Sequence, residues 1–335
     1  MTLIKKIGIV LGILLLLLLL AVIFVPKNFH AEVTDTIDPQ PKTVFNIINN
    51  MTLEPSWNPW QQQDTSMTIT YGDVTTGIGA NYSWKSNDMG DGSAEYIEVQ
   101  QDQKIVSKLS FGGMGGGNAT YTLTPTSTGG TEVKWELDSE TSRPWNLMNL
   151  LIKSSTKKSF RQGIKNLAIL AVEREKTGLY RGYQIKEELI QERTYITNRE
   201  VISFDKIQQF YSSSLGPLFR KIQEAGVEMD GHPSGLVYNH DFTTNTIDMA
   251  AAIPISEDVA IQGASSESIA TRRGVVIDYY GDYADTEGAH GAIDEYLADR
   301  GLSFDWPVVE EYVTDPSEEP NPEKWLTRII YYIGE

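Results

Sequence analysis

An uninterrupted run of 19 apolar, uncharged residues, Ile7 to Val25, constrains this chain more than any other feature. As a helix rising about 1.5 Å per residue, the run reaches roughly 28 Å, close to the thickness of a bilayer's hydrocarbon core. No face of this helix would be polar, which argues against a core helix of a soluble domain. Lys5 and Lys6 precede the run, and a short basic tail stays on the cytoplasmic side. Residues 1–29 are therefore predicted to form a cytoplasmic tip and a single-pass anchor in the cytoplasmic (inner) membrane, with the remaining chain outside the cytoplasm.

A cleaved signal peptide is the alternative interpretation of the same run. However, the run is longer than a typical signal core, and Phe29-His30-Ala31 lacks the paired small residues of a cleavage site. These two observations favour an anchor that is retained, through residues 7–25.

The charge and the cysteine count exclude several classes of function. The formal net charge is −17, and a surface of this sign repels phosphate backbones, so no nucleic-acid partner is expected. It also disfavours lying flat on anionic lipid, and it favours cationic ligands or simply confers solubility. The chain has no cysteine, which excludes disulfides, thiolate catalysis and Cys-ligated zinc.

Residues 30–176 are predicted to form one α+β domain. Six alternating segments between Met67 and Leu137, separated by Gly, Asp and Ser clusters, are typical of strands joined by hairpins. Apolar residues recur at helical spacing in Pro41–Asn50 and in a longer stretch, Pro144–Glu173. The order strand, helix, antiparallel sheet, long helix describes a curved sheet that grips a C-terminal helix.

Three local features accompany this order: Val44-Phe45 after Asp38-Pro39, the turn Trp57-Asn58-Pro59-Trp60 followed by Asp64, and the terminal amphipathic helix. With these features the region resembles the START-like (SRPBCC, polyketide-cyclase-like) superfamily. The resemblance implies a helix-grip fold with an apolar cavity between helix and sheet, and hence a lipid-like or aromatic ligand. Five aromatic residues are candidates to line this cavity or, alternatively, to pack in an ordinary core: Trp57, Trp60, Tyr82, Trp84 and Trp135.

Residues 177–335 contain an internal repeat of strand, helix, strand, strand. The first copy is predicted to have strand 185–195, helix 205–225, and strands 236–238 and 248–255. The second has strand 268–279, helix 286–300, and strands 308–313 and 325–333. Tyr238 and Tyr312 fall at matching places, and this alignment puts Leu236 where the second copy has Glu310. The duplicated βαββ unit predicts one sheet with paired helices and a cleft on the pseudo-twofold axis.

Four local motifs stand out in the second copy: Tyr279-Tyr280-Gly281-Asp282-Tyr283, the helix end Arg300-Gly301-Leu302, the block Glu310-x-Tyr312-x-x-Asp315-Pro316, and the late strand Trp325–Ile333. In these motifs the second region resembles the GyrI-like domain, which is also the effector-binding domain of AraC- and MerR-type regulators. The resemblance implies a cleft that binds small, often cationic and aromatic molecules, with Glu310 as the leading ligand residue and Tyr312 beside it. Secondary candidates are Tyr279, Tyr280, Tyr283 and Trp306.

Elementary chemistry agrees with this implication. A carboxylate in an aromatic, poorly solvated environment attracts a cation, and tyrosine faces add cation–π attraction. Glu311 is expected on the opposite face of the strand, because successive side chains alternate. The alternative is that Glu310 is a surface strand residue and that the tyrosines belong to the core.

Catalytic and metal motifs are sparse. The four histidines lack metal-ligand spacing and are expected in solvated or capping roles, so no metal and no cofactor is predicted. No serine lies in a nucleophile elbow. Glu310 with Tyr283 or Tyr312 has the residue types of a base and an acid, which keeps a hydrolase of reactive small molecules as an alternative.

The sequence thus favours a bacterial, membrane-anchored protein that binds or senses hydrophobic or cationic aromatic small molecules, without a DNA-binding domain. Two alternatives stay open: a hydrolase acting at the GyrI-like cleft, and a membrane-tethered interaction scaffold.

Overall fold

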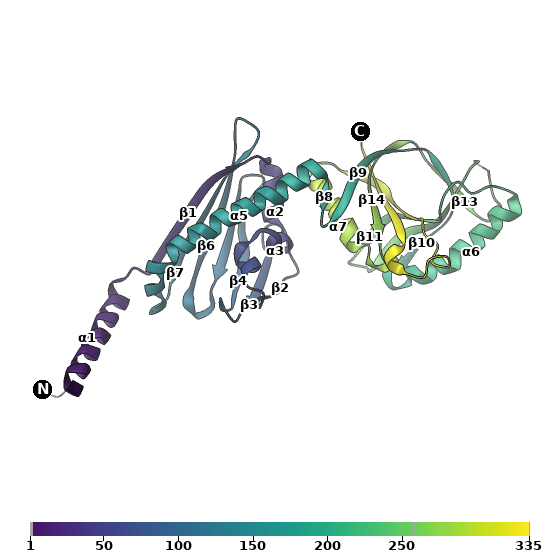
Figure 1. Cartoon of the computed structure of the whole chain (residues 1–335). Helices are drawn as coiled ribbons and strands as arrows, with labels where there is room; N and C mark the ends of the chain where they lie inside the picture. Colours follow the sequence, from purple (N-terminus) through teal and green to yellow (C-terminus); the bar gives the residue numbers. More distant parts are fainter. Residues whose placement is uncertain (1–2, 258, 335) are drawn as a thin grey trace. The chain divides into compact units, whose positions relative to one another are not determined.

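The computed structural model describes residues 3–257 and 259–334, which divide into two compact units, Met1–Lys176 and Thr177–Glu335 (Figure 1). Met1 and Thr2, part of the expected cytoplasmic tip, lie outside the described residues. Both units are mixed α+β structures built on antiparallel sheets.

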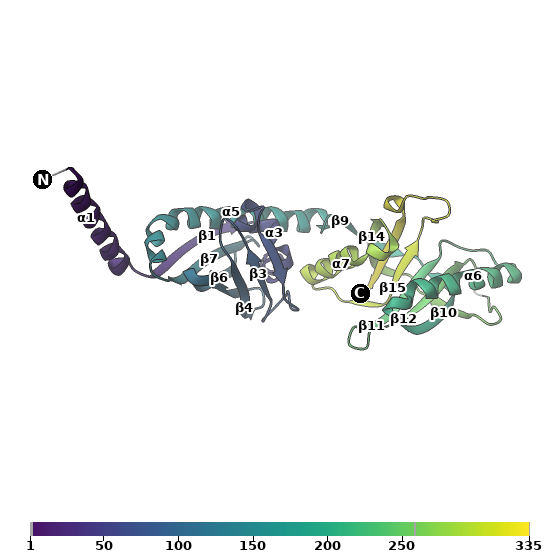
Figure 2. The same cartoon turned by 90° about the horizontal axis from the view of Figure 1, so that it is seen from below.

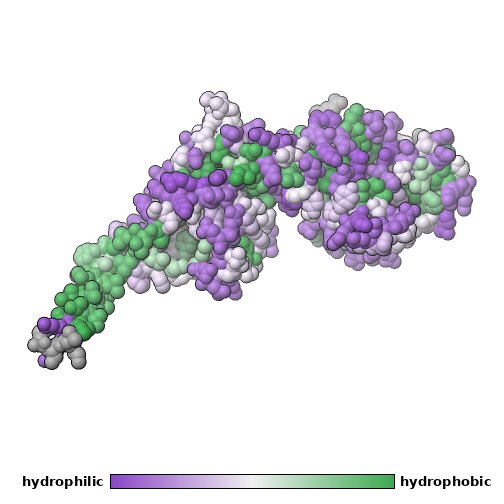
Figure 3. Space-filling view, in the orientation of Figure 1, coloured by the Kyte–Doolittle hydropathy of each residue, from purple (hydrophilic) through white to green (hydrophobic). Residues whose placement is uncertain are grey.

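The first unit begins with helix α1, Leu3–Phe24. The stretch Lys5–Phe24 is long and apolar enough to cross a membrane by length and composition, and none of it is buried inside the protein. Its surface is apolar over nearly its whole length (Figure 3). The predicted apolar helix is therefore confirmed as a helix that could span a bilayer.

Within the described residues, the first unit holds a seven-stranded antiparallel sheet in the order β1-β7-β6-β5-β4-β3-β2. Its strands are β1 Asn28–Ile37, β2 Thr68–Tyr71, β3 Asn81–Lys85, β4 Gly92–Gln100, β5 Lys104–Ser110, β6 Gly115–Pro125 and β7 Thr131–Thr141. The first strand pairs with the last, Asn28 opposite Glu140, because the chain returns to it after the hairpins. Alternating burial along β1 turns one face of the sheet toward the core.

Helices cover this inner face. Short helices follow β1: α2 Pro41–Asn49, the 3₁₀ turn η1 Met51–Leu53, α3 Glu54–Trp57 and α4 Pro59–Gln63. The 29-residue helix α5, Asn149–Thr177, runs along the same sheet (Figure 2). Gly163 permits its close approach, since a Cβ there would lie 2.4 Å from the Trp135 ring. This arrangement is the predicted helix grip.

The long helix starts later than predicted. Residues Trp145–Met148 form a 3₁₀ turn, η3, and α5 begins only at Asn149. A separate short 3₁₀ turn, η2, lies earlier in the chain at Gly112–Met114. Apolar periodicity does not distinguish a 3₁₀ turn from the first turn of an α-helix, so the sequence placed the start at Pro144.

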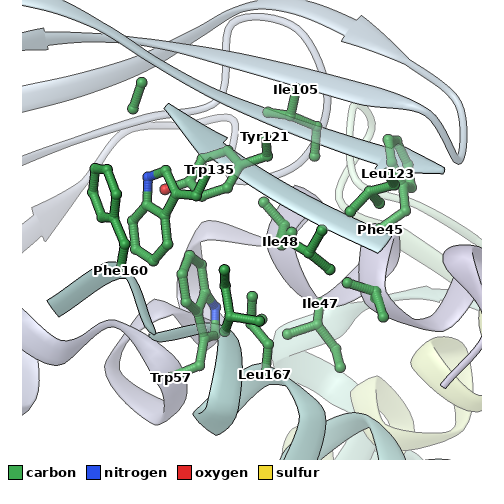
Figure 4. Packing of buried hydrophobic residues seen from close by; sticks show 14 of the residues in the cluster. Phe45, Ile47, Ile48, Trp57, Ile105, Tyr121, Leu123, Trp135, Phe160 and Leu167 are labelled. Carbon is green, nitrogen blue, oxygen red and sulfur yellow. The ribbon is translucent and has the colours of Figure 1, made fainter. Parts of the chain in front are cut away.

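The core of the first unit is aromatic at its centre. Trp135 stacks on Phe160 of α5 with ring centroids 4.5 Å apart, and it meets Trp57 edge-on at 5.6 Å. Aliphatic residues of α2 and β5, Ile48 and Ile105 among them, extend this core along the sheet (Figure 4). Aromatic pairs of this kind add to the stability that area burial already provides.

Within the described residues, the second unit holds a nine-stranded antiparallel sheet in the order β13-β10-β12-β11-β15-β16-β14-β9-β8. Its strands are β8 Leu179–Tyr180, β9 Tyr183–Ile190, β10 Arg193–Ser203, β11 Ser234–Asp241, β12 Thr246–Ile255, β13 Ser265–Ile269, β14 Arg272–Tyr280, β15 Phe304–Tyr312 and β16 Leu326–Ile333. Helix α6 is Ile207–Ala225 and α7 is Glu287–Arg300, with 3₁₀ turns η4 Phe204–Lys206, η5 Tyr283–Asp285 and η6 Pro322–Lys324.

The strand order shows the duplication that the sequence predicted. The set β10-β12-β11 and the set β14-β16-β15 meet where β11 pairs with β15, and each set carries one helix. Two predicted strands are divided in the structure: 185–195 becomes β9 and β10, and 268–279 becomes β13 and β14. Neither break contains Gly or Pro, so the sequence carried no turn signal there.

Candidate functional site

Strand β15 carries the leading candidate at the centre of the second sheet. Glu310 lies opposite Gly235 of β11, at the junction of the two copies. Its neighbour Glu311 points to the other face, where it forms an ion pair of 2.8 Å with Arg193. The expected alternation therefore separates the two glutamates, and Glu310 and Tyr312 lie on the side where α6 and α7 pack.

Two donors hold the Glu310 carboxylate. His290 of α7 places Nε2 2.8 Å from Oε1, and the Tyr312 hydroxyl donates to Oε2 over 3.0 Å. On the far side of the imidazole, Nδ1 lies 3.0 Å from the Tyr331 hydroxyl. A neutral imidazole with its proton on Nε2 satisfies both contacts, because Nδ1 then accepts from the tyrosine. The two contacts thus orient the carboxylate.

Aromatic rings form the wall beside this carboxylate. The Tyr312 ring meets Tyr211 of α6 at 5.5 Å and Tyr283 of η5 at 5.0 Å between centroids, and Tyr283 meets Trp325 at 4.9 Å. Glycine at position 235 makes room for them: a Cβ there would lie 1.9 Å from the Tyr211 hydroxyl and 3.1 Å from that of Tyr312. We call Glu310, Tyr312, His290, Tyr211, Tyr283 and Tyr331 the Glu310 cluster.

The cluster keeps its tyrosines protonated. Burial raises the pKa of Tyr312 well above its usual value, and the negative charge of Glu310 raises it further. Burial and the charge of Glu310 also raise the pKa of Tyr211. Burial raises the pKa of Tyr331, and the charges of Asp294 and Glu310 raise it further. The hydroxyl groups are therefore donors at neutral pH.

The charge of Glu310 is not compensated by a permanent cation. Among the described residues, no lysine or arginine forms an ion pair with it, and its partner His290 is charged only when protonated. The two side chains are 17% and 24% exposed, respectively, so solvent reaches both. A carboxylate has about four lone-pair sites, and two donors leave room for a further partner.

The other sequence-predicted residues of this region are not part of the cluster. Tyr279 is buried in the core, with its hydroxyl donating to the Asp282 carbonyl. Tyr280 is 62% exposed. Trp306 packs against His240 and Phe304. The structure thus brings together Glu310, Tyr312 and Tyr283 of the predicted set.

The alignment of the two copies matched residues that lie on opposite faces of the sheet. Leu236 pairs with Val309 and lies in the core on the opposite face, whereas Gly235 faces Glu310. Tyr238 likewise bonds Glu267 instead of joining Tyr312. A one-residue offset reverses the face of every side chain, and β11 contains a bulge between Val237 and Asn239.

Sequence reasoning missed three members of the cluster. His290 was expected in a solvated or capping role and instead bonds Glu310. Tyr211 and Tyr331 carried no signal, because a tyrosine on an amphipathic helix or a buried strand is ordinary. The predicted cleft on the pseudo-twofold axis, in a sheet with paired helices, was the one hint that α6 and α7 would supply residues.

In the first unit, the five predicted aromatic residues belong to the core. Trp57 and Trp135 are fully buried and Tyr82 nearly so, while Trp60 and Trp84 pack against them partly exposed. Within the described part of the chain, the indole Nε1 atoms of Trp57 and Trp135 have no hydrogen-bond partner. The structure therefore shows packing among these residues, with two unpaired donors inside it.

A buried carboxyl group, which the sequence did not single out, lies at the edge of this aromatic core. Glu54 is only 4% exposed. Its Oε2 accepts from the Tyr82 hydroxyl and from Asn58 Nδ2, both over 2.8 Å, and from Gln61 Nε2 over 3.1 Å. Burial raises the pKa of Glu54 to about 7, although these hydrogen bonds oppose the shift.

Comparison with known proteins gives no sequence relative. No protein-family model matches the chain, and no curated protein matches it.

Solved structures are similar in fold. The EcmrR C-terminal domain is 15% identical, with 46% of this chain and 98% of that chain covered and a TM-score of 0.41. The Zhui aromatase/cyclase from Streptomyces sp. R1128 is 9% identical, with 45% and 98% covered and a TM-score of 0.37. Protein CV1439 from Chromobacterium violaceum is 15% identical, with 42% and 96% covered and a TM-score of 0.34. At these identities the likeness concerns the fold alone.

Proposed function

We propose that this chain is a membrane-anchored binding protein for small cationic aromatic molecules. Helix α1 anchors it in the inner membrane, and the Glu310 cluster of the second unit binds the ligand outside the cytoplasm. The first unit is a START-like domain, and the second is a GyrI-like effector-binding domain used without a DNA-binding domain.

One observation carries the proposal: Glu310 is a charged, uncompensated carboxylate beside tyrosine rings. A cation near it gains Coulombic attraction, which is stronger in a partly desolvated site than in water. Each suitably placed ring face adds about 0.5 to 2 kcal/mol of cation–π attraction. The Tyr312 hydroxyl donates to the carboxylate, and the rings of Tyr312 and Tyr283, with centroids 5.0 Å apart, offer such faces.

Support for the anchor comes from charge as well as length. Lys5 and Lys6 are the first two residues of the span Lys5–Phe24, and a short basic end is retained in the cytoplasm. The chain as a whole carries a net charge of −17, although its N-terminal end is basic, so the acidic remainder would attract cations before they reach the site.

The test is ligand-induced thermal stabilisation of the full chain in detergent micelles. Cationic aromatic dyes, benzyltrimethylammonium with its neutral isostere neopentylbenzene, and fatty acids are each added to wild type and to Glu310→Gln. At about 100 times Kd a ligand contributes about 2.7 kcal/mol, which raises Tm by about 5 to 10 °C in a domain of this size. We expect cations to stabilise wild type only, and neopentylbenzene to have no effect that depends on Glu310.

Glu200→Gln is the matched control, because it removes one negative charge from an exposed position on β10 of the same unit. Equal cation-induced shifts in wild type and Glu310→Gln would refute the cationic site. Product formation from an activated ester, lost in Glu310→Gln, would favour the hydrolase alternative over binding alone.

A further inference from the structure

The segment that follows β7 is fastened to the end of the apolar helix. Arg143 donates from Nε to the Val22 carbonyl over 2.9 Å and from Nη2 to the Ile23 carbonyl over 2.8 Å. Asn146 Nδ2 lies 2.9 Å from the Val22 carbonyl and 2.8 Å from that of Val25. These carbonyl groups belong to the last turn of α1 and its exit, where a helix has no partners of its own.

Asn149, one turn later, forms hydrogen bonds to the carbonyl groups that follow α1. Its Nδ2 lies 3.2 Å from the Pro26 carbonyl and 3.1 Å from that of Lys27. Asn146 is fully buried in this junction. Three side chains therefore hold η3 and the start of α5 at the level where the apolar span ends, which in a membrane is the interface.

Apolar side chains project from this segment into solvent. Trp145 is 46% exposed, Met148 44%, Leu150 68% and Leu151 81%. Four large apolar residues within seven positions form a patch, whereas exposed apolar residues on soluble surfaces are usually scattered singly. Tryptophan is enriched at membrane interfaces, where its ring is apolar and its N–H is hydrated.

The charge of this segment has the opposite sign to the chain as a whole. Residues 143–161 contain Arg143, Lys153, Lys157, Lys158 and Arg161 and no acidic residue, although the chain carries −17. Lys153 and Lys157 lie within about 12 Å of Asn149 along α5. Basic side chains near an anionic leaflet gain about 1 kcal/mol each. The overall acidity argues against lipid contact, but this basic segment is the local exception.

We infer that residues 145–151 form a second lipid contact, in which Trp145, Met148, Leu150 and Leu151 insert into the membrane interface beside α1. The inference rests on the proposed membrane anchor. With the hydrogen bonds from Arg143, Asn146 and Asn149, this contact fixes the orientation of the first unit on the bilayer.

The absence of native cysteine makes the test direct, since each introduced cysteine is unique. A nitroxide is attached to Leu151→Cys or Trp145→Cys in the full chain, reconstituted in phosphatidylcholine–phosphatidylglycerol vesicles. Electron paramagnetic resonance then compares its accessibility to oxygen, which concentrates in lipid, and to a water-soluble nickel chelate. Leu16→Cys, in the middle of α1, is the reference for a label in lipid. Ile169→Cys is the reference for a label in water, because Ile169 lies further along α5 and is 59% exposed.

We expect oxygen-to-nickel ratios at positions 151 and 145 that are severalfold above that at position 169 and below that at position 16. If the label at position 151 is as accessible to the nickel chelate as the label at position 169, while the label at position 16 is in lipid, the second lipid contact is refuted. The proposed membrane anchor would then still stand. Shielding of the 151 label from both reagents would mean that protein covers the patch, which also overturns it. A label at 16 that is open to nickel refutes the anchor itself.

Discussion

The buried carboxyl group of Glu54 makes the stability of the first unit depend on pH. Its folded-state pKa of about 7 lies above the ordinary value of 4.5 because the group is desolvated. Below pH 4.5 the group is protonated in both the folded and the unfolded chain. Between pH 4.5 and 7 only the folded chain keeps the proton, so the free energy of unfolding falls as pH rises through this window.

The size of the effect follows from the two pKa values. The pKa of Glu54 is about 7 in the folded chain and 4.5 in the unfolded chain, and each pH unit between them is worth about 1.4 kcal/mol. The free energy of unfolding is therefore about 3 kcal/mol lower at pH 8 than below pH 4.5. Glu54→Gln keeps an oxygen to accept from Tyr82, Asn58 and Gln61 and cannot ionise. Relative to wild type, we therefore expect the variant to gain about 3 kcal/mol between pH 4.5 and pH 8, or about 6 to 12 °C in Tm.

Thermal unfolding of the full chain in detergent, followed by tryptophan fluorescence, measures this difference. Most of the seven tryptophans, Trp57, Trp60, Trp84, Trp135 and Trp145, report on the first unit. Other groups also titrate in this range, so the quantity of interest is the variant minus the wild type at each pH. Glu95→Gln, at an exposed position of β4, should give a flat difference. Parallel pH curves for wild type and Glu54→Gln would refute the assignment of a raised pKa to Glu54.

Two further predictions test packing in the two units. Gly235→Val places a side chain where the Tyr211 hydroxyl lies, so cation-induced stabilisation should disappear. Tyr238→Phe, on the opposite face of the sheet, should leave that stabilisation intact. Loss in both variants would show that the effect is not local to the Glu310 cluster. Phe160→Ala removes the ring stacked on Trp135 and should lower the free energy of unfolding of the first unit by about 3 to 5 kcal/mol. Urea denaturation measures this loss. A loss below about 1 kcal/mol would mean that the stack is not part of a tightly packed core.

Local periodicity in the sequence was enough to predict the elements. Nineteen apolar residues from Ile7 to Val25 predicted a helix, and one runs from Leu3 to Phe24. Alternation predicted most strands of both sheets. The same rule put Glu310 and Tyr312 on one face of β15 and Glu311 on the other, because neighbours in a strand point to opposite sides whatever surrounds them. Breaks without Gly or Pro, as between β9 and β10, were missed because no turn residue marks them.

Tertiary structure decided which distant residues meet. His290 and Tyr211 reach the Glu310 cluster from two helices, and no spacing in the sequence encodes how those helices pack on the sheet. The register of β11 on β15 made Gly235, and not Leu236, the cross-strand neighbour of Glu310. Register and packing are set by contacts between residues far apart in the chain. Sequence periodicity is local, so it fixes the face of a side chain, whereas only the folded chain fixes its partners.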